Sequence, residues 1–128
     1  MRKRILVVDD EEEVVSTIKM LLESTKEYEV RTMTEAKDII SSVHAFHPDV
    51  ILLDLLMPDT GGMEVCQMLN NDSLGATIPI IILSGLGKDI DKQDAYKLGV
   101  VDYLVKPVSR NDLIAGVEKA IKLKSETD

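Results

Sequence analysis

The chain has 128 residues, a formal net charge of −8 and 45% hydrophobic residues. This length suits one domain, and no apolar run is long enough to cross a bilayer. The acidic balance argues against direct binding of nucleic acid, and the single cysteine excludes an internal disulfide and suits a reducing cytoplasm. We therefore expect one cytoplasmic domain over residues 1–128, with its core at about 3–123 and a polar tail or linker start at 122–128.

Strand-like and helix-like patterns alternate along the chain. Runs rich in apolar and β-branched residues predict strands at 3–8, 28–33, 50–54, 78–83 and 100–105. Apolar residues at helical spacing predict helices at 11–24, 34–43, 63–69, 88–98 and from 109 onward. Thr34 and Ser109 are expected to cap the second and last helices, and Gly99 to end the fourth.

This alternation predicts a parallel sheet with helices on both faces and right-handed connections. The strands at 3–8, 50–54 and 78–83 are the most apolar and should lie centrally, whereas the more polar strand at 28–33 fits an edge. The predicted fold is α/β, a flavodoxin-like doubly wound five-stranded parallel sheet of order 2-1-3-4-5 with five helices.

Polar side chains stand where four of these strands end. They are Asp9, Asp10, Asp54, Ser84 and Lys106. Because the carboxyl ends of parallel strands share one edge of the sheet, these residues should meet there. Taken singly, each has another explanation, such as a helix cap, a turn residue or a solvated strand end.

Converging carboxylates predict a bound cation, because two charges about 4 Å apart repel by roughly 4 kcal/mol at an effective dielectric near 20. Oxygen ligands without histidine or cysteine select Mg²⁺ or Mn²⁺, and the chain has no EF-hand loop to favour Ca²⁺. A metal, the Lys106 amine and the Ser84 hydroxyl around Asp54 suit phosphoryl transfer to that carboxylate. Before transfer, Lys106 should pair with Asp54.

The order and spacing of several short motifs resemble a response-regulator receiver domain of two-component signalling. The motifs are Asp9-Asp10, Asp54 followed by Met57-Pro58, Ser84-Gly85, Tyr103 and Lys106-Pro107. The resemblance implies that Asp54 is the phosphoacceptor and that Ser84 and Lys106 bind the phosphoryl group. It also implies Mg²⁺ on Asp10 and Asp54, on Asp9 mainly through water, and on the Leu56 carbonyl, with a cis bond before Pro107.

A switch follows from the same resemblance. Ser84 would move toward the phosphoryl group and Tyr103 would turn inward, which changes the face of the fourth helix, fifth strand and fifth helix. The implied partners are a histidine kinase or phosphotransfer protein and a downstream effector domain or protein, but no membrane. The domain would be a monomer or a phosphorylation-dependent dimer, and it would hydrolyse its own phosphoryl group slowly without acting as an enzyme on other substrates.

Some positions depart from this pattern. Gly61 stands where the family often has Asp, and we hypothesise that Leu56 and Leu86 restrict the attacking water and prolong the phosphorylated state. Val101 and Gly116 replace an acidic residue and an arginine, which argues against one type of charge-paired dimer.

Two other functions use similar residues. An aspartate-nucleophile phosphohydrolase of the haloacid-dehalogenase type would need an acid two residues after Asp54, where this chain has Leu56. A flavodoxin-like FMN carrier would need a phosphate-binding loop after the first strand, where the acidic run Asp9–Glu13 repels phosphate. His44 and His47 should lie far from the carboxylate edge. Cys66 should lie on a helix as a packed thiol rather than a reactive one.

Overall fold

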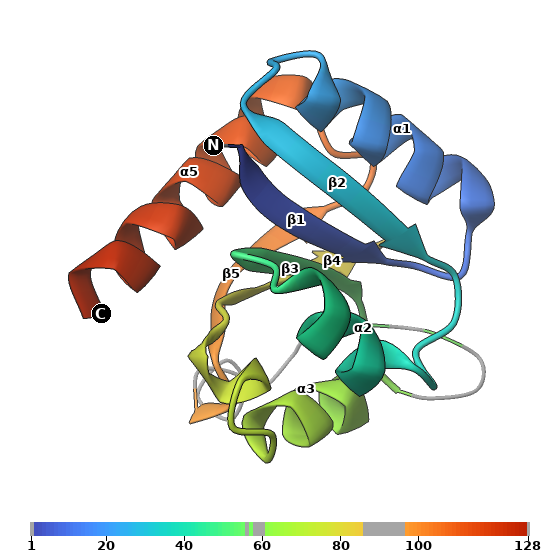
Figure 1. Cartoon of the computed structure of the whole chain (residues 1–128). Helices are drawn as coiled ribbons and strands as arrows, with labels where there is room; N and C mark the ends of the chain where they lie inside the picture. The colour runs from blue at the N-terminus through green and yellow to red at the C-terminus, as the bar shows by residue number, and fades with distance from the viewer. Residues whose placement is uncertain (1, 56, 58–60, 86–96, 128) are drawn as a thin grey trace.

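A computed structural model describes residues 2–55, 57, 61–85 and 97–127 (Figure 1). Its centre is a five-stranded parallel sheet in the order β2-β1-β3-β4-β5. The strands are β1 (Lys3–Val8), β2 (Tyr28–Met33), β3 (Val50–Asp54), β4 (Ile80–Ser84) and β5 (Val100–Val105). The predicted strand order, the central strands and the polar edge strand are all confirmed.

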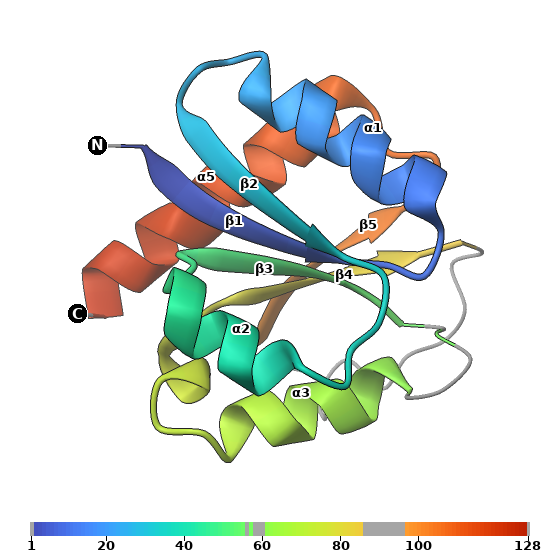
Figure 2. The same ribbon diagram turned by 45° about the vertical axis from the view of Figure 1, so that its right-hand side comes forward.

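Helices cover both faces of the sheet. Within the described residues they are α1 (Glu12–Glu23), α2 (Ile39–Phe46), α3 (Gly62–Asn70), α5 (Arg110–Thr127) and a 3-10 helix η1 (Gly75–Thr77). The expected helix at 88–98 falls almost wholly on 86–96, outside the described residues. Because α1 and α5 lie on one face and α2 and α3 on the other, the arrangement is the predicted flavodoxin-like one (Figure 2).

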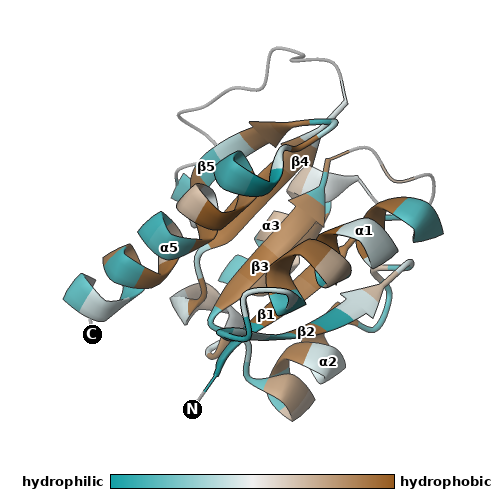
Figure 3. Cartoon of the chain, turned by 90° about the horizontal axis from the view of Figure 1, so that it is seen from above, coloured by the Kyte–Doolittle hydropathy of each residue, from teal (hydrophilic) through white to brown (hydrophobic). Residues whose placement is uncertain are grey.

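The central strands are buried on both faces, and Figure 3 shows the strong hydropathy of β3. Along β3, Ile51 and Leu53 join the core under α2 and α3, whereas Val50 and Leu52 join the core under α1 and α5. All four side chains are fully buried. A strand buried on both faces needs an unbroken apolar sequence, which is why its end at the polar Asp54 is so abrupt.

Two helix boundaries differ from the prediction. The second helix begins at Ile39 rather than after Thr34, because a turn bonds the Ile39 amide to the Ala36 carbonyl at 3.0 Å. Ala36 is buried in that turn, so the apolar spacing extends beyond the helix itself. At the other end α5 continues to Thr127, and residues 122–127 are helical rather than a tail.

Other local predictions are confirmed. The Ser109 hydroxyl accepts a hydrogen bond from the Asp112 amide at 3.1 Å, as a helix cap should. Gly99, directly before β5, has φ +89°, the left-handed conformation expected of it, although the helix that it should end lies almost wholly outside the described residues. Among the helices of the described residues, none combines the length and the apolar character needed to span a membrane.

Candidate functional site

The carboxyl ends of the strands bring the predicted polar residues to one edge of the sheet. β1 and β3 pair in parallel with Val8 opposite Leu53, so Asp9 and Asp54, the next residue of each chain segment, lie side by side. On the other side of β3, the Lys106 amide donates to the Ser84 carbonyl at 2.7 Å and extends the pairing of β4 and β5. Hydrogen bonding of the strands, rather than loop geometry, therefore positions the site.

Three carboxylates meet at this edge. One oxygen each from Asp9, Asp10 and Asp54 lies within 4.8 Å of the others. Asp9 is fully buried and Asp54 is 4% exposed, whereas Asp10 is open to solvent. This set of hard oxygen donors with one open side fits a divalent cation such as Mg²⁺ that keeps part of its water shell. The expected carbonyl ligand, Leu56, lies outside the described residues.

Lys106 supplies the positive charge of the site. Its Nζ lies 2.6 Å from Asp9 Oδ2, 3.5 Å from Asp54 Oδ1 and 3.8 Å from Glu11 Oε1. The pairing with Asp54 is present, but Asp9 is the nearer partner. Burial by itself would lower the pKa of Lys106, yet its contacts with these three carboxylates outweigh burial and hold that pKa above the usual lysine value. Lys106 is therefore protonated and positively charged at neutral pH.

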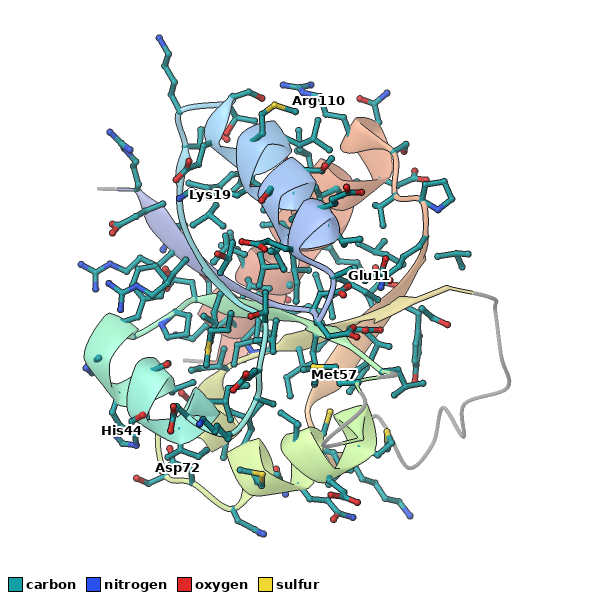
Figure 4. The ribbon with its side chains drawn as sticks, turned by 90° about the vertical axis from the view of Figure 1, so that its right-hand side faces the viewer. Glu11, Lys19, His44, Met57, Asp72 and Arg110 are labelled. Carbon is teal, nitrogen blue, oxygen red and sulfur yellow. The ribbon has the colours of Figure 1, made fainter. Side chains whose placement is uncertain are left out.

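Asp9 is held from two directions. Its Oδ2 faces the Lys106 amine, and its Oδ1 accepts a hydrogen bond from the Glu11 backbone amide at 2.9 Å. The segment that leads into α1, where Figure 4 labels Glu11, thus fixes the orientation of Asp9, the most deeply buried acid of the site. An acid fixed in this way presents its oxygens in a defined direction.

The segment after Asp54 is fixed by a close backbone approach. The Gly62 amide donates to the Leu55 carbonyl at 2.9 Å, and a Cβ on Gly62 would lie 2.6 Å from Leu55 Cα and 3.0 Å from the Asp54 carbonyl oxygen. Only glycine fits at that distance. The Gly61-Gly62 pair is the only signal in the sequence for this close approach, and it does not show which of the two glycines is required.

Ser84 ends β4, the strand next to β3, and Tyr103 lies on the following strand, β5. Ser84 is 6% exposed at the end of β4, one strand away from Asp54. Tyr103 stands opposite Ile82, packs against the core under α2 and α3, and has a buried hydroxyl oxygen. The Lys106–Pro107 peptide bond is cis, which is the isomer that the resemblance implied.

A groove of about 510 Å³ opens beside the site between α1 and the segment that joins β5 to α5. Its lining includes Glu11, Val14, Lys106 and Pro107, so the groove adjoins the Lys106 side of the acidic edge. A larger hollow of about 620 Å³ lies at the opposite end of the strands, near Lys3.

The remaining candidates lie elsewhere, as predicted. His44 Nε2 lies 2.9 Å from the Asp72 carboxylate, which also accepts amide hydrogen bonds from Leu74 and Gly75. Figure 4 shows this pair well away from Glu11 and Met57 at the acidic edge. Cys66 is fully buried within α3.

Comparison with known proteins agrees with this geometry. Residues 5–118 match the response regulator receiver domain family. The alkaline phosphatase synthesis transcriptional regulatory protein PhoP of Bacillus subtilis is 37% identical over 126 residues, which cover 98% of this chain and 51% of that protein. The chain spans about half the length of the curated relatives it matches.

Solved structures show the same fold. A response regulator receiver domain protein from Clostridium thermocellum is 32% identical with a TM-score of 0.85, covering 98% of this chain and 99% of its own. A CheY-like receiver domain protein from Methanospirillum hungatei has a TM-score of 0.88 over 100% of both chains at 23% identity. The chain therefore belongs to the response regulator receiver domain family, whose members are phosphorylation-controlled switches of two-component signalling.

Proposed function

We propose that Asp54 accepts a phosphoryl group from a phosphohistidine of a histidine kinase or phosphotransfer protein. The observation that carries the proposal is the setting of Asp54, a nearly buried carboxylate with two further carboxylates close by and the Lys106 amine 3.5 Å away. Such a carboxylate is poised to act as a nucleophile once its charge is balanced.

The transfer itself needs only one bond to form and one to break. A carboxylate oxygen of Asp54 attacks phosphorus in line, the P–N bond to the donor imidazole breaks, and its electron pair returns to the imidazole nitrogen. Lys106 balances the negative charge of the phosphoryl oxygens, and the Ser84 hydroxyl donates a hydrogen bond to one of them. The hydrogen bond that the Glu11 backbone amide donates to Asp9 Oδ1 holds that carboxylate in place.

Asp10 and Asp54 would hold Mg²⁺ or Mn²⁺ directly, Asp9 mainly through water, with the Leu56 carbonyl as a further ligand. When bound, the ion would neutralise charge on the transferring oxygens. The three carboxylate oxygens within 4.8 Å of one another support this assignment.

Phosphorylation would act through Ser84 and Tyr103. We infer that Ser84 moves toward the phosphoryl group and that Tyr103 turns inward into the space that Ser84 leaves. The face formed by the fourth helix, β5 and α5 would then change for an effector domain or protein. The adjacency of β4 and β5 supports this coupling, because Ser84 pairs with Val105 only two residues from Tyr103. The domain would work in the cytoplasm, as a monomer or a phosphorylation-dependent dimer. Its folded core would be residues of about 3–123.

The decisive experiment is intact mass spectrometry after incubation with acetyl phosphate and Mg²⁺. We expect a single phosphoryl adduct on the wild type and on the control Asp112→Asn, but none on Asp54→Asn. Adducts on both the wild type and Asp54→Asn, or on neither, would refute the assignment of Asp54.

The same phosphorylated sample tests two further points. Leu56→Asn should speed autodephosphorylation if an apolar side chain there excludes the attacking water; equal rates would dispose of that hypothesis. Sustained turnover of a phosphomonoester would favour the phosphohydrolase alternative over a switch.

A further inference from the structure

The outer edge of β2 is blocked at Val30. The Lys3 backbone amide donates to the Glu27 carbonyl, and the Asp9 backbone amide donates to the Met33 carbonyl. The odd-numbered residues of β2 therefore direct their backbone groups toward β1. Backbone groups alternate in direction along a strand, so those of Tyr28, Val30 and Thr32 point away from the sheet. Such unpaired groups are a template for another strand.

One ion pair on α1 takes up both outward groups of Val30. Lys19 Nζ donates to the Val30 carbonyl at 2.9 Å, and Glu23 Oε2 accepts from the Val30 amide at 3.4 Å. The same two side chains bond each other at 3.1 Å. Figure 4 shows Lys19 on α1 alongside this strand. Two side chains one helical turn apart thus replace the partner strand at the middle of the edge.

The edge is complementary to itself. In an antiparallel pair centred on Val30, the two Val30 residues would exchange both backbone hydrogen bonds. Glu29 of one copy would then face Arg31 of the other on the same side of the sheet, and both side chains are exposed. Opposite charges directly across two strands favour pairing. The charge pattern therefore selects a second copy of this chain as the strand that fits.

We propose that the β2 edge is a latent dimer interface that the Lys19–Glu23 pair holds closed. The pair keeps this edge from joining a second copy. While the pair is in place, dimers that form through another surface of the domain do not have to compete with pairing of the β2 strands.

The test compares Lys19→Ala/Glu23→Ala with Glu35→Ala/Lys37→Ala in the full chain. The control removes another ion pair of the same net charge, which is 3.9 Å long and exposed. In sedimentation experiments, the Lys19/Glu23 variant should form dimers as its concentration rises. The control and the wild type should form no dimer through this edge. A Lys19/Glu23 variant that stays as monomeric as the control would overturn the proposal.

Two readouts locate the contact. Disulfide trapping should join Glu29→Cys in one copy of the variant to Arg31→Cys in another, because residues directly opposite have Cβ atoms about 5 Å apart. In dilute Glu23→Ala, the Val30 amide should exchange with deuterium about tenfold faster than in the wild type, because it loses a bond to a charged acceptor. An unchanged exchange rate would also count against the closure.

If the double alanine variant does not fold, Lys19→Met, which keeps the aliphatic stem, is measured in the same way. Concentration-dependent dimers trapped between positions 29 and 31 would support the proposal, and a monomer would refute it.

Discussion

Lys106 contacts two of the three carboxylates that would hold a divalent cation. The amine lies 2.6 Å from Asp9 and 3.5 Å from Asp54, two of the three residues that would hold the ion. A charge at this distance in a largely buried site is worth more than one on an open surface. At the scale of single residues, we therefore expect the Lys106 amine and a bound metal ion to compete for these carboxylates.

Removing the internal cation should strengthen metal binding. We expect Lys106→Met to bind Mg²⁺ roughly three- to tenfold more tightly than the wild type, by up to about 1.4 kcal/mol, measured by titration calorimetry. Lys122→Met, which loses the same charge on the exposed side of α5, should leave the affinity unchanged. Weaker binding by Lys106→Met would show that the amine supports the metal ligands rather than competing with the ion.

Cys66 should be inert in the folded protein. Burial raises the pKa of its thiol from 9.0 to about 11, so at neutral pH the reactive thiolate is about a hundredfold scarcer than in an open thiol. We expect no reaction with a disulfide reagent at pH 8 until the chain unfolds. In Cys66→Ala/Met68→Cys, the thiol moves to a site that is 38% exposed and should react at once.

The same shift sets a pH dependence. The unfolded thiol ionises near pH 9 and the folded one only near 11, so this contribution to stability is complete below pH 9 and declines between pH 9 and 11. Cys66→Ala should lose less stability than the wild type over that interval. Equal losses in denaturant titrations would contradict the assignment.

At the scale of elements, the distance between α3 and the end of β3 depends on one glycine. Leu55 Cα and the Asp54 carbonyl leave no room for a Cβ on Gly62, whereas the position of Gly61 has nothing within 4 Å. The two neighbours therefore look alike in sequence but differ completely in their surroundings.

This contrast gives a matched pair of variants. Gly62→Ala should lower the free energy of unfolding by about 1–3 kcal/mol, because the helix start must move away from β3. Gly61→Ala, at φ −64°, should change it by less than about 0.5 kcal/mol. Chemical denaturation measures both, and equal effects would mean that the helix start adapts without strain.

At the scale of the whole molecule, the acidic chain brings negative charges together at the edge of the sheet that holds Asp54. The net charge is −8, and three carboxylates gather within 4.8 Å of one another with Lys106 as their partner. The domain should thus be more stable with a divalent cation than without one, because binding to the folded state alone shifts the unfolding equilibrium.

Asp10 tests that expectation because it is the exposed member of the cluster. We expect Asp10→Asn to raise the melting temperature without metal, by relieving repulsion, and to abolish the further rise that Mg²⁺ gives the wild type. Asp112→Asn, an acid in the first turn of α5, should leave the Mg²⁺ response intact. A full Mg²⁺ response in Asp10→Asn would remove it from the ligand set.

Much of the architecture could be predicted because it depends on short stretches of chain. The bounds of β1, β2, β3 and β5 follow from the β-branched and apolar runs, and the strand order follows from which runs are most apolar. The start of α2 was missed because Ala36 is buried in a turn, and a buried residue satisfies a helical pattern whether or not its backbone is helical.

The sequence by itself determined which residues gather at the acidic edge, since strand direction and the alternation of elements place Asp9, Asp54 and Lys106 together without any knowledge of distances. Only the tertiary structure decided that Lys106 lies nearer Asp9 than Asp54 and that position 62 must be glycine to fit against Leu55. It also decided that Lys19 and Glu23 bind the backbone carbonyl and amide of Val30. Each of these depends on differences of about 1 Å or less in the separation of segments that lie far apart in the chain, or of a helix and its neighbouring strand. Local side-chain patterns carry no measure of such differences.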